Sequence, residues 1–396
     1  MNTYYYPIHK EPRFIFHVDL DAFFASVEKV LHPEWKNKAV IVGGATNRGV
    51  VACPSYEARA LGVKTAMPAY KARMIAPQAI FVQGNFANYR RFSEKFFDVL
   101  FEFSDKLEPR SLDEAYIDVS HLAKNVQEAH QLAKDVQFMI QKKLGLSASI
   151  GVAKNKVCAK VASDMRKPGG ITIVTPGQEK LFLSSLPIEN LPGIGYRTKQ
   201  VLNGLNIWRI GQLAGFPEKV LIDTFGKSGR MLHAFANGMD FREVQAPQES
   251  KSVSHSRTLF RDTRDVTMLK SELWQLLEKV CARLRQQRRT SDTVTVTVRF
   301  SDFSTFSKQK KIYHASYLEK ELWSTAEQLL HDLLQERRPV RLVGVAASNL
   351  QKISPQTSLF DYPFSKIKNI QLALDKIRRN FGFEAIQSGR ALQTQK

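Results

Sequence analysis

The 396-residue chain has few cysteines and no long apolar run, and each absence excludes a class of protein. Its three cysteines, Cys53, Cys158 and Cys281, are too scattered for a disulfide framework or a cysteine metal site. No stretch approaches the roughly 20 apolar residues that a membrane-spanning helix needs. The first residues lack the basic-then-apolar pattern of a signal peptide. These absences predict a protein of the reducing cytoplasm that does not associate with a membrane.

Acidic residues are scarce beside basic ones. The chain has 38 Asp and Glu against 58 Lys and Arg, a formal net charge of +20. With 43% hydrophobic residues it can still bury a core, and its length allows two to four domains. A folded protein with a strongly basic surface favours a polyanionic partner. Nucleic acid is the first candidate for that partner, and an anionic membrane surface is the second.

The stretch 111–118 contains two adjacent carboxylates, Asp113 and Glu114, between two short apolar segments. The segment before it is interrupted by Pro109, and residues 115–117 have the composition of a strand. A tight connection between strands can aim two carboxylates at one point. Hard divalent cations prefer oxygen ligands, and two of them roughly 3.5–4 Å apart can clamp a phosphoryl group. An Asp-Glu pair in a turn is by itself usually a solvated surface feature.

A second acidic motif lies upstream, where the strand-like run 14–21 ends in Asp19-Leu20-Asp21. Residues two apart on a strand face the same side, so Asp19 and Asp21 are expected on one face. A carboxylate at the end of a buried strand is unfavourable unless a positive group meets it. Asp19, Asp113 and Glu114 together could supply oxygen ligands for two Mg²⁺ ions. The alternative for this run alone is a strand end that opens into solvent.

The runs 17–24 (HVDLDAFF) and 111–116 (SLDEAY), in this order and spacing, resemble the Y-family translesion DNA polymerases, and most closely the bacterial DNA polymerase IV (DinB) class. The resemblance implies an α+β multidomain protein shaped as a right hand. It comprises an antiparallel-sheet palm, small fingers, a helical thumb with a helix-hairpin-helix element, and an α/β little-finger domain. The implied boundaries are palm 1–23 and 86–178, fingers 24–85, thumb 179–241, linker 242–251, little finger 252–349 and a clamp-binding tail 350–396.

The resemblance also implies the roles of individual residues. Asp19, Asp113 and Glu114 would be the catalytic residues and, with the backbone carbonyl of Leu20, would hold two Mg²⁺ ions. Asp21 would be structural or would support the metal-binding residues indirectly. The residues that would bind the incoming nucleotide are Phe23, Phe24, Tyr56, Arg59 and Lys167, with Phe24 as the steric gate against a ribose 2′-hydroxyl. Gly169 stands where the family pattern has asparagine, a departure expected to alter only the turn.

The residue pattern supports part of this assignment. Tyr56 and Arg59 are three apart and share a helical face near its N-terminus, where free amides and the helix dipole favour an anion. An ordinary amphipathic helix with a surface arginine is the alternative.

Two glycine-rich segments and a basic region suggest contacts with the DNA backbone. Gly193 and Gly195 lie in a Leu-Pro-Gly-Ile-Gly turn between helical stretches, and Gly226 and Gly229 form a second such segment. Their backbone amides could meet DNA phosphates without reading sequence. Residues 251–350 carry 18 Lys and Arg against 11 Asp and Glu. A solvated basic surface is the alternative, but an open basic sheet face suits the duplex backbone.

The tail contains Gln356-Thr357-Ser358-Leu359-Phe360, which resembles the peptide through which bacterial polymerases bind the β sliding clamp. Gln356, Leu359 and Phe360 would contact the clamp. A short segment that presents Leu and Phe to an apolar pocket can tether an enzyme without a large interface. Five-residue motifs also arise by chance. Residues 367–381 have the pattern of an amphipathic helix, to which no function is assigned.

The predicted function is low-fidelity, template-directed DNA synthesis past damaged templates in DNA repair and replication, without proofreading, in the manner of a mutator protein. As a nucleotidyltransferase, the enzyme would bind primer-template DNA and deoxynucleoside triphosphates, as a nucleoid-associated cytoplasmic monomer. One alternative is a non-catalytic relative that serves only as a DNA- and clamp-binding scaffold. Another is a phosphatase of the haloacid-dehalogenase kind, with Asp19 as nucleophile.

Overall fold

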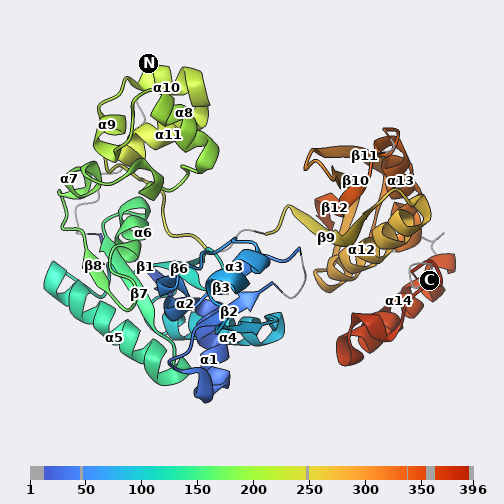
Figure 1. Ribbon diagram of the computed structural model, residues 1–396, viewed down its shortest axis with the longest axis horizontal. Helices are drawn as coiled ribbons and strands as arrows, with labels where there is room; N and C mark the ends of the chain where they lie inside the picture. Colours follow the sequence, from blue (N-terminus) through green and yellow to red (C-terminus); the bar gives the residue numbers. More distant parts are fainter. Residues whose placement is uncertain (1–12, 45–47, 247–248, 337, 354–361, 392–396) are drawn as a thin grey trace. The chain divides into compact units, whose positions relative to one another are not determined.

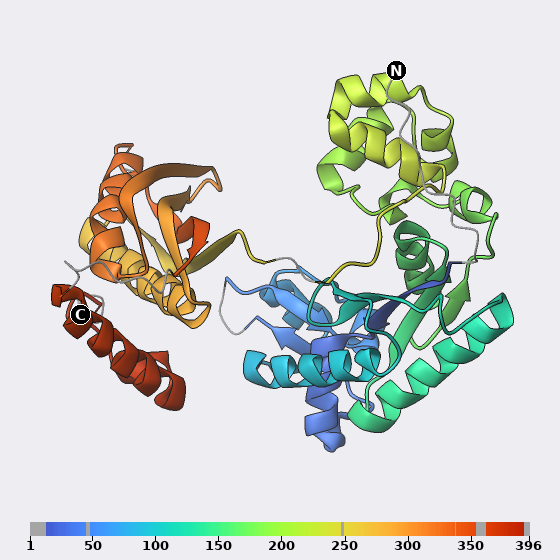
Figure 2. The same ribbon diagram turned by 180° about the vertical axis from the view of Figure 1, so that it is seen from behind.

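The computed structural model describes residues 13–44, 48–246, 249–336, 338–353 and 362–391, without side chains for 362–368. The predicted clamp-binding residues Gln356, Leu359 and Phe360 lie outside the described residues. The chain forms two compact units, Met1–Pro247 and Gln248–Lys396, drawn from opposite sides in Figure 1 and Figure 2. Among the helices in the described parts of the chain, none has the length and apolar content of a membrane span.

The first unit is built on a five-stranded sheet. Its strands, in spatial order, are β5 (Leu107–Pro109), β6 (Glu114–Asp118), β1 (Ile15–Leu20), β7 (Ala148–Ala153) and β8 (Ile171–Ile173). The first four pair antiparallel, as predicted for the palm, but β8 pairs with β7 in parallel. The prediction of a wholly antiparallel palm sheet is wrong at this edge. The chain leaves β7, crosses through helix α6 (Lys156–Asp164) and returns in the same direction, as a strand-helix-strand crossover must.

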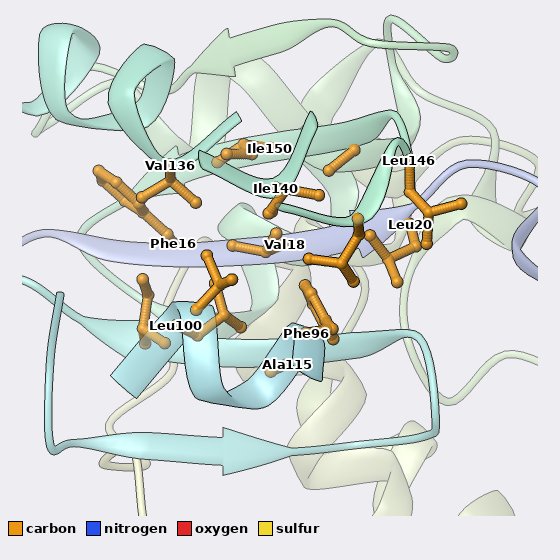
Figure 3. Packing of buried hydrophobic residues seen from close by; sticks show 14 of the residues in the cluster. Phe16, Val18, Leu20, Phe96, Leu100, Ala115, Val136, Ile140, Leu146 and Ile150 are labelled. Atoms are coloured by element: carbon orange, nitrogen blue, oxygen red, sulfur yellow. The ribbon is translucent and has the colours of Figure 1, made fainter. Parts of the chain in front are cut away.

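Central strand β1 is buried along its whole length because both faces of the sheet are covered. On one face, Phe16, Val18 and Leu20 pack with side chains from α4 (Phe86–Phe101) and α5 (Val126–Leu144). Figure 3 shows these side chains meeting in one apolar layer. On the other face, Ile15 packs with residues of α6. The position of β1 is therefore fixed from both sides, and with it the backbone that carries Asp19.

A small three-stranded sheet forms the part of the chain predicted as fingers. Strand β2 (Val40–Gly43) lies between β3 (Val51–Pro54) and β4 (Ile80–Val82). The accompanying helices are α1 (Phe23–Leu31), α2 (Tyr56–Ala60), α3 (Ala69–Ile75) and the short 3₁₀ helix η1 (Pro33–Trp35). Only six side chains form its buried cluster: Ile41, Val51, Ala58, Val63, Ala72 and Ala76. Because this core is small, the fingers place little protein beside the site that they border.

Short helices follow the palm sheet, as expected for a thumb. They are α7 (Glu179–Ser184), η2 (Ile188–Asn190), α8 (Tyr196–Gly204), α9 (Ile210–Ala214), α10 (Glu218–Phe225) and α11 (Lys227–Ala236). Buried leucines such as Leu202, Leu221 and Leu232 bring them into one apolar cluster, which also includes Val157 of α6.

The second unit is a four-stranded antiparallel sheet with helices. Its elements in chain order are β9 (Ser252–Thr263), α12 (Val266–Gln286), β10 (Arg289–Phe300), β11 (Thr305–Ser316), α13 (Glu319–Leu333) and β12 (Val340–Lys352). The spatial order of the strands is β11-β10-β12-β9. Residues 293–298 alternate between Thr and Val, and Val294, Val296 and Val298 are buried in the core shared with the helices.

The predicted C-terminal helix exists and begins earlier than expected, as α14 (Tyr362–Phe381), followed by η3 (Phe383–Ala385). Two buried ion pairs hold it to α12. Arg378 donates to Glu278 Oε1 at 2.9 Å, and Arg285 donates through two nitrogens to Asp375 at 2.6 and 2.9 Å. Removing one partner of such a pair would leave a buried charge uncompensated, so the described part of the tail is an integral part of this unit.

Candidate active site

A pocket with a volume of about 270 Å³ lies in the first unit, between the palm sheet and the fingers. Its lining includes eight of the residues predicted for metal and nucleotide binding: Asp19, Leu20, Phe23, Phe24, Tyr56, Arg59, Asp113 and Lys167. These side chains come from segments nearly 150 residues apart in the sequence.

The palm sheet places the carboxylates. Asp19 is the last but one residue of β1 and lies opposite Glu114, the first residue of β6, in the antiparallel register. The backbone N–H of Leu20 donates to the carbonyl of Asp113 at 2.9 Å, which holds the turn before β6 against the end of β1. Within that turn, Ser111 Oγ donates to Asp113 Oδ1 at 2.5 Å and accepts from the N–H of Glu114 at 3.1 Å.

Two lysines from α6 and the loop after it meet these carboxylates. Lys160 Nζ lies 2.6 Å from Glu114 Oε2 and 3.4 Å from Asp19 Oδ2. Lys167 Nζ lies 2.8 Å from both Asp19 Oδ1 and Asp164 Oδ1. Burial opposes the charge of Lys167, but Asp19 and Asp164 raise its pKa above the usual value. Sequence reasoning did not find Lys160, because its role depends on how α6 packs against β1.

Glu114 is the most strongly compensated of the three acids. Hydrogen bonding with His17 and Lys160 lowers the pKa of Glu114 to about 2, against the opposing effect of burial. His17 Nε2 is 3.5 Å from Glu114 Oε2, whereas its Nδ1 bonds Ser163 Oγ at 2.8 Å. Burial lowers the pKa of His17 and favours its neutral form, so Lys160 is the firmer partner of Glu114.

Asp113 differs in its charge environment. Burial raises its pKa above the usual value, and the charges of Asp19 and Glu114 raise it further, while the Ser111 hydrogen bond opposes them. A positive ion beside Asp113 would relieve this mutual repulsion.

The structure brings the three acids together only in part. Within the described ranges, no group of three or more His, Cys, Asp or Glu side chains is arranged to hold a metal ion. Asp19 and Asp113 line the pocket, while Glu114 bonds Lys160 beside it. The donor set still fits a hard divalent cation, because carboxylate oxygens and the Leu20 carbonyl are the ligands such ions prefer.

The aromatic pair after β1 separates into two environments. Phe23 is 2% exposed and belongs to the main core, although it also borders the pocket. The half-buried Phe24 stacks on Tyr89, with ring centroids 4.4 Å apart and planes inclined by 22°. Tyr89 is anchored in turn, because its hydroxyl donates to Glu28 Oε1 at 2.6 Å. The Phe24 ring therefore rests against a fixed aromatic surface at the pocket wall.

Tyr56 and Arg59 reach the pocket from α2. Ser55 caps this helix by accepting from the N–H of Ala58. Arg59 Nε donates to the carbonyl of Pro54 at 3.1 Å, and its guanidinium carbon lies 5.0 Å from the centroid of the Tyr56 ring. Burial and the nearby Asp21 carboxylate raise the pKa of Tyr56 to about 12, so its hydroxyl stays a donor. The Arg59 guanidinium has further N–H groups that can donate to an anion, whereas the Tyr56 hydroxyl donates its one hydrogen to Asp21 Oδ1 at 3.3 Å.

Asp19 and Asp21 do not share one environment, although strand alternation predicted that they face the same side. Strand β1 ends at Leu20, and Ala22 adopts a left-handed conformation with φ 45°. Of the two acids, only Asp19 is in the pocket lining. Asp21 is 2% exposed and accepts hydrogen bonds from protein groups. Its predicted structural role agrees with this placement.

The four thumb glycines have different local roles. Gly195 is the N-cap residue of α8, and open space surrounds the position a Cβ would take. Gly193 and Gly226 have φ of +98° and +62°, which favour glycine. Gly229 packs α11 against α10, because a Cβ there would lie 2.0 Å from the Leu221 carbonyl oxygen. The amides of Gly226 and Gly229 already donate to Ile222 and to Gly226, so the Gly193–Gly195 turn is the better phosphate-binding candidate.

Comparisons with known proteins agree with this architecture. Residues 18–164 match the impB/mucB/samB family, residues 250–359 match its C-terminal domain, and residues 189–240 match the thumb domain of DNA polymerase-iota. A DNA polymerase IV of Dehalococcoides mccartyi is 41% identical over 96% of this chain and 97% of its own. A DNA polymerase IV of Desulfatibacillum aliphaticivorans is 37% identical over 94% of this chain and 95% of its own.

Solved structures show the same similarity. The Y-family DNA polymerase chimera Dbh-Dpo4(243-245)-Dbh superposes with a TM-score of 0.78 at 33% identity, covering 86% of this chain and 99% of its own. The insertion ternary complex of Dbh DNA polymerase has the same identity and coverage, with a TM-score of 0.61.

The palm sheet, the small fingers and the acidic pocket between them define a right-hand polymerase. The chain belongs to the Y family of DNA polymerases, in the bacterial DNA polymerase IV (DinB) class. It is a DNA-directed DNA polymerase that performs low-fidelity translesion synthesis. Enzymes of this family use divalent metal ions. The alternative of a phosphatase has no support, because the matches span nearly the whole chain and concern polymerases.

Proposed function

We propose that the pocket between palm and fingers is the polymerase active site, and that it binds the primer end and an incoming deoxynucleoside triphosphate. The observation that carries this proposal is the lining of one pocket by Asp19 and Asp113, by the rings of Phe23 and Phe24, and by polar side chains that include Tyr56 and the cations Arg59 and Lys167. Acids suit metal ions, cations suit a triphosphate, and rings can contact a sugar. These three kinds of side chain are the ones that the proposed reaction requires.

Asp19, Asp113, Glu114 and the carbonyl of Leu20 would hold two Mg²⁺ ions, which activate the primer 3′-hydroxyl and neutralise charge on the triphosphate. Tyr56, Arg59 and Lys167 hold the triphosphate so that its α-phosphate faces that hydroxyl. The Phe24 ring excludes a 2′-hydroxyl from the sugar position, and Phe23 supports the Phe24 ring from the core. Pyrophosphate leaves after the attack.

The domain boundaries follow the same logic. We assign residues 1–23 and 86–178 to the palm, 24–85 to the fingers, 179–241 to the thumb and 252–349 to the little finger. The break between the two compact units falls after Pro247, inside the assigned linker 242–251. Gly193 and Gly195 of the thumb and the basic sheet of the little finger would contact phosphates of the primer-template duplex, without reading its sequence. Gly226 and Gly229 shape the same helical region.

Primer extension by the purified chain on intact and damaged templates tests the proposal. Mg²⁺-dependent addition of single nucleotides opposite a lesion is the expected result. A chain that binds DNA but adds no nucleotide would favour the scaffold reading instead. The small core of the fingers supports tolerance of damaged templates, because little protein surface is available to inspect the nascent pair.

We also propose that the tail binds the bacterial β sliding clamp, and that the enzyme acts as a monomer at the nucleoid in the cytoplasm. Replacing Leu359 and Phe360 with alanine is expected to abolish stimulation of synthesis by the clamp, because two apolar anchors are lost. Synthesis without the clamp is expected to stay within about twofold of the parent, since neither residue is among those proposed to bind metal, nucleotide or DNA. Extension assays with and without clamp measure both. Equal loss in the two assays would contradict a clamp-specific role.

A further inference from the structure

We propose that Asp21 is a positioning residue that fixes the triphosphate-binding groups of the fingers and of the Lys167 loop to the palm, so that both reach the nucleotide together. This inference rests on the proposed nucleotide pocket. Asp21 follows β1 directly and lies two residues from Asp19, yet it is absent from the pocket lining. It acts through the residues it holds.

Every polar atom of Asp21 has a partner. Its backbone N–H donates to the Ser147 carbonyl at 2.9 Å, and its carbonyl accepts from Ser26 Oγ at 2.6 Å. Its carboxylate accepts four hydrogen bonds. Oδ1 accepts from Ser149 Oγ at 2.7 Å and from the Tyr56 hydroxyl at 3.3 Å. Oδ2 accepts from Ser147 Oγ at 2.7 Å and from the N–H of Gly169 at 2.8 Å.

The donors to this buried carboxylate come from three separate parts of the fold. Ser147 and Ser149 precede and begin the palm strand β7, which pairs with β1 and is fixed by the sheet. Tyr56 belongs to helix α2 of the fingers, and Gly169 follows Lys167 by two residues. One carboxylate thus joins two contributors to the pocket, helix α2 and the Lys167 loop, to a strand of the palm sheet. Hydrogen bonds to a charged acceptor are stronger than neutral ones, so the junction resists displacement.

The turn at Gly169 explains the departure from asparagine noted in the sequence. Gly169 has φ +70°, a left-handed conformation that glycine and asparagine both tolerate. Its N–H points at Asp21 Oδ2 and lies 3.1 Å from Ser149 Oγ as well. The contact uses the backbone, so it is independent of the side chain at this position. Lys167, two residues earlier, is thereby directed toward Asp19 and the pocket.

A role for Asp21 as a metal ligand does not fit these contacts. Both carboxylate oxygens are each engaged by two donors, and the side chain is buried away from solvent. A metal ligand would affect the chemical step, whereas a residue that positions nucleotide-binding groups affects the concentration of nucleotide needed. The two roles therefore predict different kinetic results.

The test is Asp21→Asn in the full-length chain, assayed by single-nucleotide insertion at varied nucleotide concentration. The substitution turns one acceptor oxygen into an amide NH2 group, which donates. That group then faces two other donors, either the hydroxyls of Ser149 and Tyr56 or the Ser147 hydroxyl and the Gly169 N–H. KM for the nucleotide is expected to rise about 10- to 100-fold, the range for losing a hydrogen bond to a charged group. We expect kcat to change less than about threefold, and the affinity for primer-template DNA to stay unchanged.

The matched control is Asp118→Asn, which removes a palm carboxylate that also accepts from a serine hydroxyl and an N–H. Asp118 pairs with Ile15 at the opposite end of β1 from Asp21, so its loss is expected to leave KM unchanged. Tyr56→Phe removes the partner hydroxyl and is expected to raise KM less than Asp21→Asn. In the double variant with Asp21→Asn, the rise in KM is expected to be smaller than the product of the two single effects, because both substitutions break the same hydrogen-bond network.

If Asp21→Asn does not fold, Ser149→Ala removes one donor while keeping the carboxylate, and a smaller rise in KM is expected. An unchanged KM in these variants, or a fall in kcat alone as for a metal ligand, would overturn the inference. Arg59→Ala distinguishes failure of the Asp21 inference from failure of the proposed nucleotide pocket. If Arg59→Ala raises KM and Asp21→Asn does not, only the role of Asp21 is wrong. If neither raises KM, the nucleotide pocket itself is wrongly placed.

Discussion

Asp113→Ala is expected to reduce primer extension at least about a thousandfold, because several kcal/mol of transition-state stabilisation would depend on the metal ions that this carboxylate is proposed to hold. Asp113 is hydrogen-bonded to Ser111, whereas Asp19 and Glu114 are paired with lysines. Its loss therefore removes one proposed metal ligand and leaves those ion pairs intact. Single-turnover extension at matched Mg²⁺ and salt measures the effect.

Asp118→Ala is the control for this variant, because Asp118 ends strand β6, which begins directly after Asp113, and it lies outside the pocket lining. It is expected to retain extension. DNA binding, measured separately, is expected to be the same in both variants and in the parent. An Asp113→Ala enzyme that extends primers at the parental rate would exclude the proposed active site.

Phe24→Ala is expected to admit ribonucleotides, with the preference for deoxynucleotides falling about 10- to 100-fold. The half-buried ring is held against Tyr89, so it cannot easily move aside for a 2′-hydroxyl. An extra atom forced against a well-packed wall typically costs about 1–3 kcal/mol, which corresponds to this range of discrimination. The ratio of kcat/KM for paired deoxy- and ribonucleotides, measured in parent and variant, reports the change.

Phe86→Ala provides the matched truncation. Phe86 contacts the same aromatic cluster, with its ring centroid 5.7 Å from that of Phe24, but it is 58% exposed and does not line the pocket. Sugar discrimination is expected to persist in that variant. If Phe24→Ala also keeps the parental discrimination, another group must contact the sugar.

The long elements could be predicted from the sequence because their ends carry local signals. Helix α5 occupies residues 126–144, with Asn125 accepting from the N–H of Glu128 at its start. Gly145 ends it in the left-handed conformation, with φ 71°. Strand β7 likewise coincides with an uninterrupted run of small and apolar residues, 148–153. In contrast, β4 and β8 have three residues each and are stabilised by parallel pairing with distant strands, which local patterns do not report.

Site residues that lie in a short sequence motif could be predicted, whereas a residue placed in the site only by the packing of its helix could not. The acids and Lys167 lie in short motifs that can be read along the chain. Lys160 resembles any helical lysine in the sequence, and only the position of α6 places it against Glu114. The different environments of Asp19 and Asp21 depend on where β1 ends, a boundary that alternation alone does not fix.

The outermost strand of the second unit has a consequence for how copies of the chain behave in solution. Strand β11 spans twelve residues at the edge of its sheet and is exposed along nearly all of them. A long open edge can recruit the same edge of another molecule and begin aggregation. Lys308, Lys310 and Lys311 lie on this strand, and bringing two such rows together would force like charges into contact. These lysines therefore disfavour pairing of this edge with the same edge of a second copy.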